Sequence, residues 1–292
     1  MKSFKNTSFL RLIIDTMIPI TIVISTKNEE LNIQKCISCC NEFMEIIVVD
    51  SMSTDSTKTI CNELGIPVVD FSWNGAFPKK RNWFLDNYDF KTDWVLFLDA
   101  DEFLTAEFVL EIKNLFVEGM TFVGFNLRYR NYFMGKPLRF GDRQQKLALF
   151  KVRSGRYERI EDRSWTTLDM EVHEHPQLVG KVGTVKSLIT HNDFKGLSSF
   201  FRKHDEYARW EARRFLLINS DSNRLLSIRQ KIKYALVKRW WFSYVYFIYS
   251  YFICMGMLDG RSGYEVATCK VFYFNQIRLY IREYGSTDRD HA

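Results

Sequence analysis

The chain is poor in residues that interrupt regular structure. Its 292 residues include 14 glycines and 5 prolines, and no stretch is of low complexity or repeats elsewhere. Disordered chains are enriched in charge and in breaking residues, and solenoids show a fixed period, so both classes are disfavoured. With 46% hydrophobic and 26% charged residues, the composition is that of a globular protein with a large core.

Cysteine is sparse and forms no paired framework. The six cysteines are Cys36, Cys39, Cys40, Cys61, Cys254 and Cys269. Nothing before the first apolar run resembles a cleavable secretory signal, so we expect a reducing cytoplasm. The spacing Cys36-x-x-Cys39-Cys40 resembles half of a zinc site. No second Cys or His pair follows at the required distance, however, and the spacing also suits the buried face of a helix.

The two common glycine-rich motifs that bind phosphate groups are also absent from the sequence. The sequence contains neither GxGxxG nor GxxxxGK[ST]. These loops bind the phosphates in dinucleotide-dependent dehydrogenases and in P-loop NTPases, so both classes of enzyme are disfavoured. If this chain binds a nucleotide, cationic side chains outside such loops must contact the negatively charged phosphates.

What the chain does contain is an alternation of apolar strands and helical segments. Apolar, β-branched runs occupy residues 18–25, 45–50, 66–71 and 94–99, and helix-like segments lie at 31–43 and 53–65. Continuous apolar strands separated by helices are typical of an α/β fold, in which helices cover both faces of a parallel sheet. Ligands of such sheets bind at the carboxyl ends of the strands.

Polar residues follow the strands at those carboxyl ends. Thr26 and Glu29 come after the first strand, Asp50 ends the second, and Asp99 and Asp101 come at the end of the fourth. Because the carboxyl ends of parallel strands share one edge of the sheet, we expect these side chains to converge on one cleft.

The Asp-x-Asp pair and the basic loop before it are suited to binding the diphosphate group of a nucleotide. Asp99 and Asp101 offer the oxygen ligands that a hard divalent cation prefers. Three consecutive cations at 79–81 offer positive charge to the phosphates. Two alternatives stay open: Asp101 or Glu102 caps the following helix, and the basic loop is a solvated turn.

These motifs together resemble family 2 glycosyltransferases, which have the GT-A fold. The resemblance rests on TIVISTKNEELNIQKCI at 21–37, EIIVVDSMSTDST at 45–57, KKRNW at 79–83 and WVLFLDADEFL at 94–104. Farther on, the chain resembles the bacterial branch that includes lipopolysaccharide-core glucosyltransferases. That part rests on YFMGKPLRFG at 132–141, KLALFK at 146–151, EVHEH at 171–175, ITHNDFKGLSSFFRKHDEYA at 189–208 and GMLDGRSGYEVA at 256–267.

The resemblance implies a nucleotide-sugar site with assigned positions. Glu29 and Asp50 would hold the ribose and base of the nucleotide, with Thr26 beside them on the backbone turn. Arg81, together with Lys80, would contact the base or the phosphates.

The resemblance also implies a metal cofactor, Mg²⁺ or Mn²⁺. Asp101 would ligate the ion directly, and Asp99 would face the ribose or a metal-bound water. His191 follows a strand end where related enzymes often have a histidine near the metal and the diphosphate. Asp101, Asp99 and His191 are therefore the candidate metal residues, and the ion would stabilise the departing diphosphate.

An inverting transfer needs a base on the acceptor hydroxyl. The resemblance rests locally on Val172-His173-Glu174, so Glu174 is the expected base, with Glu171 or Asp142 in reserve. The alternative is structural, because Glu174 has many arginines near it in the sequence with which it can pair.

The net charge of +6 is carried by the last third of the chain. Residues 1–199 hold 25 Lys and Arg against 26 Asp and Glu, whereas residues 200–292 hold 16 against 9. A surplus this local predicts an acidic partner for that end. Nucleic acid is disfavoured, because no recognition motif is present and the aromatic residues are not interleaved as stacking platforms.

A basic amphipathic helix is expected before an aromatic run. Leu225, Ile228, Ile232 and Leu236 recur at helical spacing. The basic residues lie mostly on the other faces: Arg224, Arg229, Lys231, Lys233, Lys238 and Arg239. The next 19 residues, 240–258, are uncharged and rich in Tyr and Trp. This pattern predicts a peripheral, monotopic anchor on an anionic membrane surface, at the cytoplasmic face of the inner membrane. A buried core helix pair and a membrane-spanning helix stay open as alternatives.

The expected organisation has three parts. Residues 1–16 form an arm, residues 17–199 a GT-A catalytic domain with nucleotide-sugar and acceptor halves at 17–104 and 105–199, and residues 200–292 a helical, membrane-associating region. The expected function is inverting, metal-dependent transfer of a sugar from a nucleotide sugar, taken as a UDP-sugar, to a lipid-linked or lipopolysaccharide-type glycan. The alternative from another class is a non-catalytic GT-A-like scaffold that binds nucleotides at the membrane.

Overall fold

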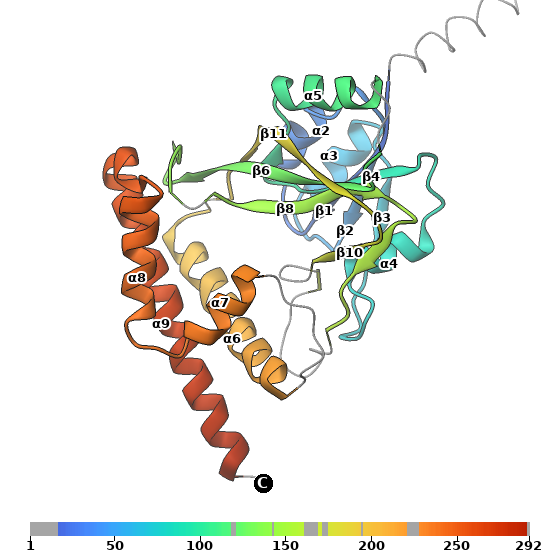
Figure 1. The fold of residues 1–292 in the computed structure, drawn as a ribbon. Coiled ribbons are helices and arrows are strands. Elements are labelled where there is room, and N and C mark those ends of the chain that lie inside the picture. The colour runs from blue at the N-terminus through green and yellow to red at the C-terminus, as the bar shows by residue number, and fades with distance from the viewer. Residues whose placement is uncertain are drawn as a thin grey trace, which may run out of the picture. The chain divides into compact units, whose positions relative to one another are not determined.

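The computed structural model describes residues 17–117, 121–141, 143–160, 169–170, 175–193, 195–220 and 228–290 (Figure 1). They form two compact units. Unit 1 contains the described residues up to Arg130 together with Gln144–His191, and unit 2 contains Asn131–Arg143 and the residues from Asn192 onward. The expected arm at 1–16 lies outside the described residues, and the domain boundaries expected from the sequence stay a prediction.

Unit 1 is built on a large mixed sheet. Its strands run in the spatial order β3-β2-β1-β4-β8-β6-β11-β5. The four on one side pair in parallel: β1 (Ile18–Thr26), β2 (Phe43–Asp50), β3 (Val68–Asp70) and β4 (Trp94–Asp99). The others are β5 (Glu102–Phe103), β6 (Gly124–Phe133), β8 (Gln145–Lys151) and β11 (Val182–His191). The pairs β4 with β8, β6 with β8, and β5 with β11 are antiparallel.

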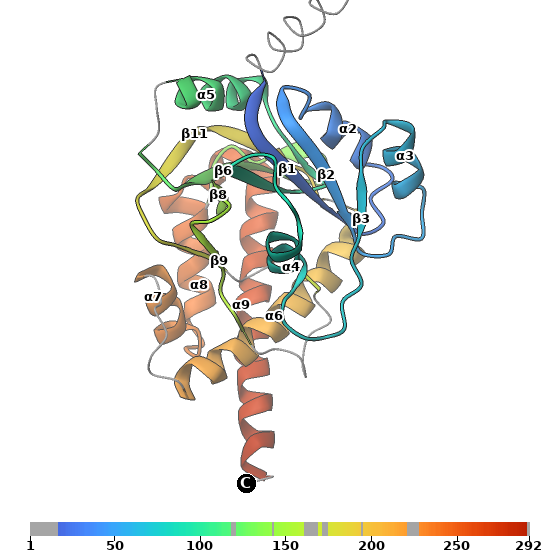
Figure 2. The same ribbon diagram turned by 90° about the vertical axis from the view of Figure 1, so that its right-hand side faces the viewer.

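Helices cover both faces of this sheet, as the apolar strands predict. In β1, Ile20, Ile22 and Ile24 point into one core and Val23 into the other. The helices α2 (Ile33–Ser38), α3 (Thr57–Glu63) and α5 (Ala106–Val117) lie on the first face. Helix α4 (Lys80–Asn87) covers the second face, as the two views of Figure 1 and Figure 2 agree. The predicted α/β fold with a GT-A-like layering is therefore confirmed.

Strand register aligns the polar strand ends. Thr26 of β1 lies opposite Asp50 of β2, and Ser25 lies opposite Asp99 of β4. At the far edge, β11 pairs with β5 so that His191 lies opposite Glu102. Residues far apart in sequence thus meet at the same end of the sheet.

Smaller elements complete the two units. In unit 1, β9 (Gly155–Tyr157) and β10 (Pro176–Leu178) form a separate antiparallel pair. In unit 2, β7 (Lys136–Pro137) pairs with the end of β6. Cys36 and Cys40 lie in the core on the inner side of α2, which agrees with the structural interpretation of the Cys cluster rather than with a zinc site.

Unit 2 is otherwise helical. It contains α6 (Leu197–Ser220), α7 (Ile228–Leu236), α8 (Phe242–Ile248), the π-helix η1 (Tyr249–Ile253), the 3-10 helix η2 (Gly256–Asp259) and α9 (Gly260–Asp290). Its core comes from α6, α7, α8 and α9. Among the described helices, none combines the length and the apolarity that crossing a bilayer requires.

Helix α7 lies where the sequence predicts a basic amphipathic helix, and Arg224 and Leu225 of that prediction lie outside the described residues. Ile232 is exposed, Leu236 packs against the core of unit 2, and Tyr234 and the following Val237 are buried in that core. Lys233, expected among the basic residues on the other faces, reaches inward to the carboxylate of Glu211 at 2.7 Å. Its charge is therefore paired within unit 2, and the membrane-anchoring role of this segment stays a prediction.

Candidate active site

Asp50 joins the two loops that follow β1 and β2. Its side chain is fully buried. The Thr26 hydroxyl donates to Asp50 Oδ1 at 2.8 Å, and the backbone N–H of Ser53 donates to Oδ2 at 2.7 Å. A buried carboxylate that accepts several hydrogen bonds fixes the chain around it. Asn28, at a positive φ of 56°, completes the turn by accepting the backbone N–H of Thr54 at 2.8 Å.

Glu29 lies in the same pair of loops. Its backbone N–H donates to the Thr57 hydroxyl at 2.8 Å, and its carboxylate accepts from the side-chain amide of Asn32 at 2.9 Å. Its side chain is half-buried. The expected nucleoside-binding residues Thr26, Glu29 and Asp50 therefore belong to one hydrogen-bonded frame at the ends of β1 and β2.

The basic loop is not a solvated turn. Lys79, Lys80 and Arg81 enter α4 with 3%, 2% and 8% of their surface exposed. Lys80 Nζ donates to the backbone carbonyl of Thr26 at 3.2 Å. Burial lowers the pKa of Lys80, and the nearby Asp169 carboxylate raises it in part. Cations are costly to bury, so their position at the strand ends needs anionic partners.

Asp169 is an anion that the sequence did not single out. Its carboxylate accepts from the Ser51 hydroxyl and lies 3.8 Å from Lys80 Nζ. Its backbone carbonyl accepts from the N–H of Lys80 at 3.0 Å. Asp169, which is 118 residues from Ser51 in the chain, is thus held beside the residues predicted to bind the nucleotide-sugar donor.

Both oxygens of Asp99 bind cations. Arg81 contacts Oδ1 at 2.7 Å and Lys146 contacts Oδ2 at 2.9 Å. Lys146 also pairs closely with the carboxylate of Glu102, which is 1% exposed. Glu102 in turn accepts from the backbone N–H of Asp99 at 3.3 Å and lies 3.5 Å from the hydroxyl of Tyr129. We call Arg81, Asp99, Glu102, Tyr129 and Lys146 the charge network.

Within the charge network, Asp99 and Lys146 are held in their ionised forms. Burial would raise the pKa of Asp99, but Lys146 and Arg81 outweigh burial and hold the pKa well below its ordinary value. Burial would lower the pKa of Lys146, but Asp99 and Glu102 hold it well above its ordinary value. Opposite charges close together in a poorly solvated place favour the charged form of each partner.

Sequence reasoning did not single out Lys146 or Tyr129. Lys146 lies near the start of β8, whose next four residues are apolar, and Tyr129 lies between two arginines on β6. A lysine at the start of an apolar strand was the available signal, but its partner could not be read from the sequence. The antiparallel pairing of β4 with β8 is what brings Lys146 to Asp99.

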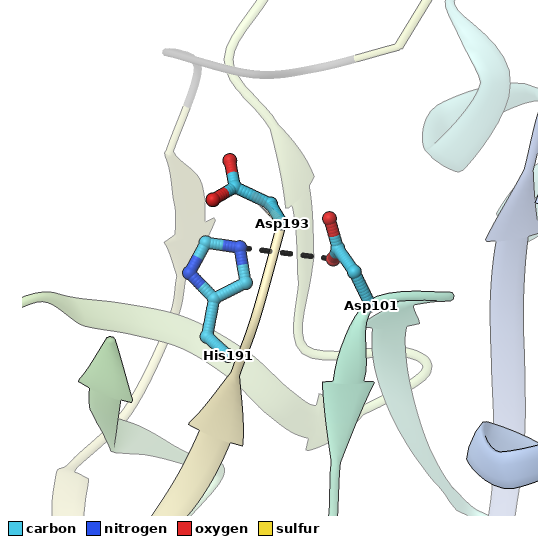
Figure 3. A group of neighbouring side chains, drawn as sticks. All are labelled: Asp101, His191 and Asp193. Atoms are coloured by element: carbon cyan, nitrogen blue, oxygen red, sulfur yellow. Dashed lines mark ion pairs between the residues drawn. The ribbon is translucent and has the colours of Figure 1, made fainter. Parts of the chain in front are cut away.

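Asp101 and His191 form a second group of potential ligands (Figure 3). Asp101 is 7% exposed, and its Oδ1 lies 3.6 Å from His191 Nε2. Asp193 follows His191 by two residues, and one ligand atom from each of the three lies within 4.8 Å of the others. Asp99 is not in this group, because both of its oxygens face the cations of the charge network. Two carboxylates and an imidazole this close together could hold a divalent cation.

The expected base lies outside the described residues. This holds for Glu174 and for both reserve candidates, Glu171 and Asp142. Their roles stay predictions, and the described part of the site contains the donor and metal candidates alone.

The chain is similar in sequence to several known glycosyltransferases. An uncharacterised glycosyltransferase of Rickettsia typhi (strain ATCC VR-144 / Wilmington) is 26% identical over 240 residues, covering 80% of this chain and 78% of that protein. The lipopolysaccharide core biosynthesis glycosyltransferase LpsC of Rhizobium meliloti (strain 1021) is 27% identical over 178 residues, covering 58% and 61%. Other rickettsial relatives are matched over only about a third of their own length.

A solved structure shares the fold. The chain superposes on a mannosyltransferase of Pyrobaculum calidifontis, determined in complex with GDP-Man and Mn2+, with a TM-score of 0.51 and 13% identity. The match covers 90% of this chain and 86% of that one. The sequence profile described as Glycosyl transferase family 2 matches residues 21–173, which include β1 to β4, the basic loop and the Asp-x-Asp pair. The chain belongs to glycosyl transferase family 2.

Proposed function

We propose that the chain is an inverting, metal-dependent glycosyltransferase that moves a sugar from a nucleoside diphosphate sugar to a lipid-linked or lipopolysaccharide-type glycan. The single observation that carries the proposal is the Asp101 and His191 group beside the charge network. A bound metal ion and cationic side chains are both able to stabilise the charge that develops on a departing diphosphate.

The ligand group fits Mg²⁺ or Mn²⁺. Two ligand atoms on opposite sides of such an ion, with bonds of about 2.1 Å, lie about 4.2 Å apart. The ligand atoms of Asp101, His191 and Asp193 lie within 4.8 Å of one another, so small side-chain movements suffice. Two carboxylates and one imidazole are donors that Mn²⁺ accepts readily and that Mg²⁺ accepts through the oxygens.

Each side chain then has a chemical role. Asp101, His191 and Asp193 would hold the metal, which supplies charge stabilisation for the departing diphosphate. Lys80 and Arg81 add fixed positive charge at the same strand ends, and Asp50 with its loop positions the nucleoside. UDP-sugars are the first donors to test, because the motif resemblance favours them. Glu174 would take the proton from the acceptor hydroxyl.

The acceptor class rests on LpsC, a relative named for lipopolysaccharide core biosynthesis, which this chain matches over 61% of that protein's length. A lipid-linked acceptor is confined to a membrane. The proposal therefore puts the enzyme at the cytoplasmic face of the inner membrane as a peripheral protein.

The decisive experiment measures release of nucleoside diphosphate from a panel of UDP-, GDP- and other nucleotide sugars, with Mg²⁺, with Mn²⁺ and with excess chelator. Asp101→Asn should lower turnover at least about 10²-fold, because a bound metal stabilises the transition state by several kcal/mol. Asp86→Asn is the matched control, since that carboxylate is exposed and pairs with Arg156 on the surface. Full turnover in excess chelator, or a fully active Asp101→Asn enzyme, would refute the metal dependence.

A further inference from the structure

Helix α8 and the π-helix η1 of unit 2 have apolar side chains on every side. On the inner side, the ring of Phe242 lies 5.1 Å from that of Phe274 on α9, and the ring of Tyr246 lies 4.6 Å from it. Ser243 and Ser250 on the same side are also buried. The inner side of α8 is therefore part of the hydrophobic core of unit 2.

The other side of this helical segment is apolar as well, but it is exposed. Its exposed residues are Trp240, Trp241, Tyr244, Val245, Ile248, Tyr249, Phe252 and Ile253. Tyr244, Val245 and Ile248 lie within one turn of α8, Trp240 and Trp241 lie in the turn just before it, and the other three lie on η1 just after it, so the exposed apolar stripe extends beyond both ends of α8. Trp240 and Ile253, at the two ends, are 68% and 70% exposed. We call this stripe the apolar face. Single exposed apolar residues are common, but a continuous stripe marks an interaction surface.

The stretch of chain that carries the apolar face, together with α7 before it, has charge of one sign. Residues 228–258 contain no Asp or Glu and five Lys or Arg. Among these, Lys231, Lys238 and Arg239 are exposed, and the last two directly precede Trp240. Lys233 is instead bound to Glu211 in the interior. An occupant of this surface must therefore offer both apolar contact and negative charge.

We propose that the apolar face inserts into the surface of an anionic lipid bilayer, with Lys231, Lys238 and Arg239 against the headgroups. Tyr and Trp favour the headgroup level, and Ile, Val and Phe favour the acyl boundary just below it. A helix lying in the interface plane uses such a composition without crossing the membrane. The inference deepens the proposed function, because the membrane that holds the enzyme would also hold a lipid-linked acceptor. The binding itself depends on no step of catalysis.

The test is co-sedimentation of the full chain with vesicles of phosphatidylcholine alone or of phosphatidylcholine mixed with phosphatidylglycerol. We expect binding to the mixed vesicles, weakened by salt. Lys231→Gln, Lys238→Gln and Arg239→Gln together should lower the partition coefficient roughly 10²-fold, given the usual contribution of each basic residue near an anionic leaflet. The matched control is Arg153→Gln, Lys181→Gln and Lys186→Gln, which removes the same charge from exposed positions of unit 1. It should bind nearly as well as the wild type.

A second set of variants tests the apolar contact. Trp240→Gln, Ile248→Gln and Ile253→Gln together should weaken binding at least tenfold and remove the part that salt does not release. The matched control is Leu110→Gln, Val117→Gln and Val179→Gln, which replaces three apolar residues of unit 1 that are exposed as much or more. Circular dichroism verifies that each variant is folded.

Three outcomes would overturn the inference. Wild-type protein that ignores the mixed vesicles refutes it directly, and so does equal loss of binding in the control variants. A stable dimer in sedimentation equilibrium that the second set of variants converts to monomers, without vesicle binding, would assign the apolar face to a second copy of the chain. Donor hydrolysis is measured in parallel. Vesicle binding without hydrolysis would refute the proposed function alone, whereas hydrolysis without binding would refute this inference alone.

Discussion

Lys146→Met offers the sharpest test of how the donor site is built. Methionine is unbranched and one atom shorter than lysine, so it fills most of the same space, but it loses the ammonium group that lies 5.1 Å from the Tyr129 ring. It removes the one charge that joins Asp99 to Glu102. The carboxylate of Glu102 then stays buried near Asp99 with its cation gone.

The expected loss of stability is about 3 kcal/mol. Removing one partner of a fully buried ion pair costs about 3–5 kcal/mol, because the other charge is left in a poorly solvated place. The Lys146 side chain is 26% exposed and Arg81 still binds Asp99, so the lower end of that range applies. For a folded unit of about 150–250 residues, such a loss of stability lowers the Tm by roughly 6–12 °C.

The loss should depend on pH in a defined direction. The lowered pKa of Asp99 means that its contribution to stability is present above the ordinary aspartate value of 3.8 and is lost as the pH falls below it. Without Lys146 the pKa of Asp99 is lowered less. The difference in unfolding free energy between wild type and variant is therefore largest near neutral pH and shrinks in acid.

Urea unfolding followed by tryptophan fluorescence measures these differences, and an unchanged m-value shows that the folded state stays compact. Glu102→Gln provides the control through a double-mutant cycle. Combined with Lys146→Met, it should restore part of the lost stability, with a coupling of about 0.5–3 kcal/mol. A loss below about 1 kcal/mol at neutral pH, or one that acid does not diminish, would contradict the reasoning.

Three further predictions concern individual site residues. Glu174→Gln should leave donor affinity intact and lower turnover about 10²–10⁴-fold, the usual contribution of a general base; a collapse of donor affinity would instead favour Glu171 or Asp142. Asp50→Ala should leave its buried hydroxyl and N–H donors unsatisfied, costing about 1–3 kcal/mol of stability, and should weaken UDP binding in calorimetry; unchanged affinity would remove Asp50 from the nucleotide site. His191→Gln should raise the Mn²⁺ concentration for half-maximal turnover at least about tenfold, and an unchanged metal titration would exclude it as a ligand.

The parallel half of the sheet and its polar strand ends follow from local sequence. Runs such as 45–50 and 94–99 are apolar without alternation, which only a strand covered on both faces requires. The register that sets Thr26 opposite Asp50, and Ser25 opposite Asp99, follows once those strands are parallel neighbours. The donor half of the site was therefore predictable, because the residues that make it lie at the ends of consecutive elements.

Other parts of the molecule depend on contacts that no local pattern encodes. Lys146 meets Asp99 only because β8 pairs antiparallel with β4, and His191 meets Asp101 only because β11 pairs with β5. Lys233, expected among the basic residues of an amphipathic helix, instead pairs with the buried Glu211 on α6. The sequence also shows that residues 240–258 are uncharged and largely apolar, but it does not show which side of this segment is buried in the protein. Only the packing of Phe242 and Tyr246 on α9 decides that, because a helix with apolar residues all round can bury any face, and its partner selects which one.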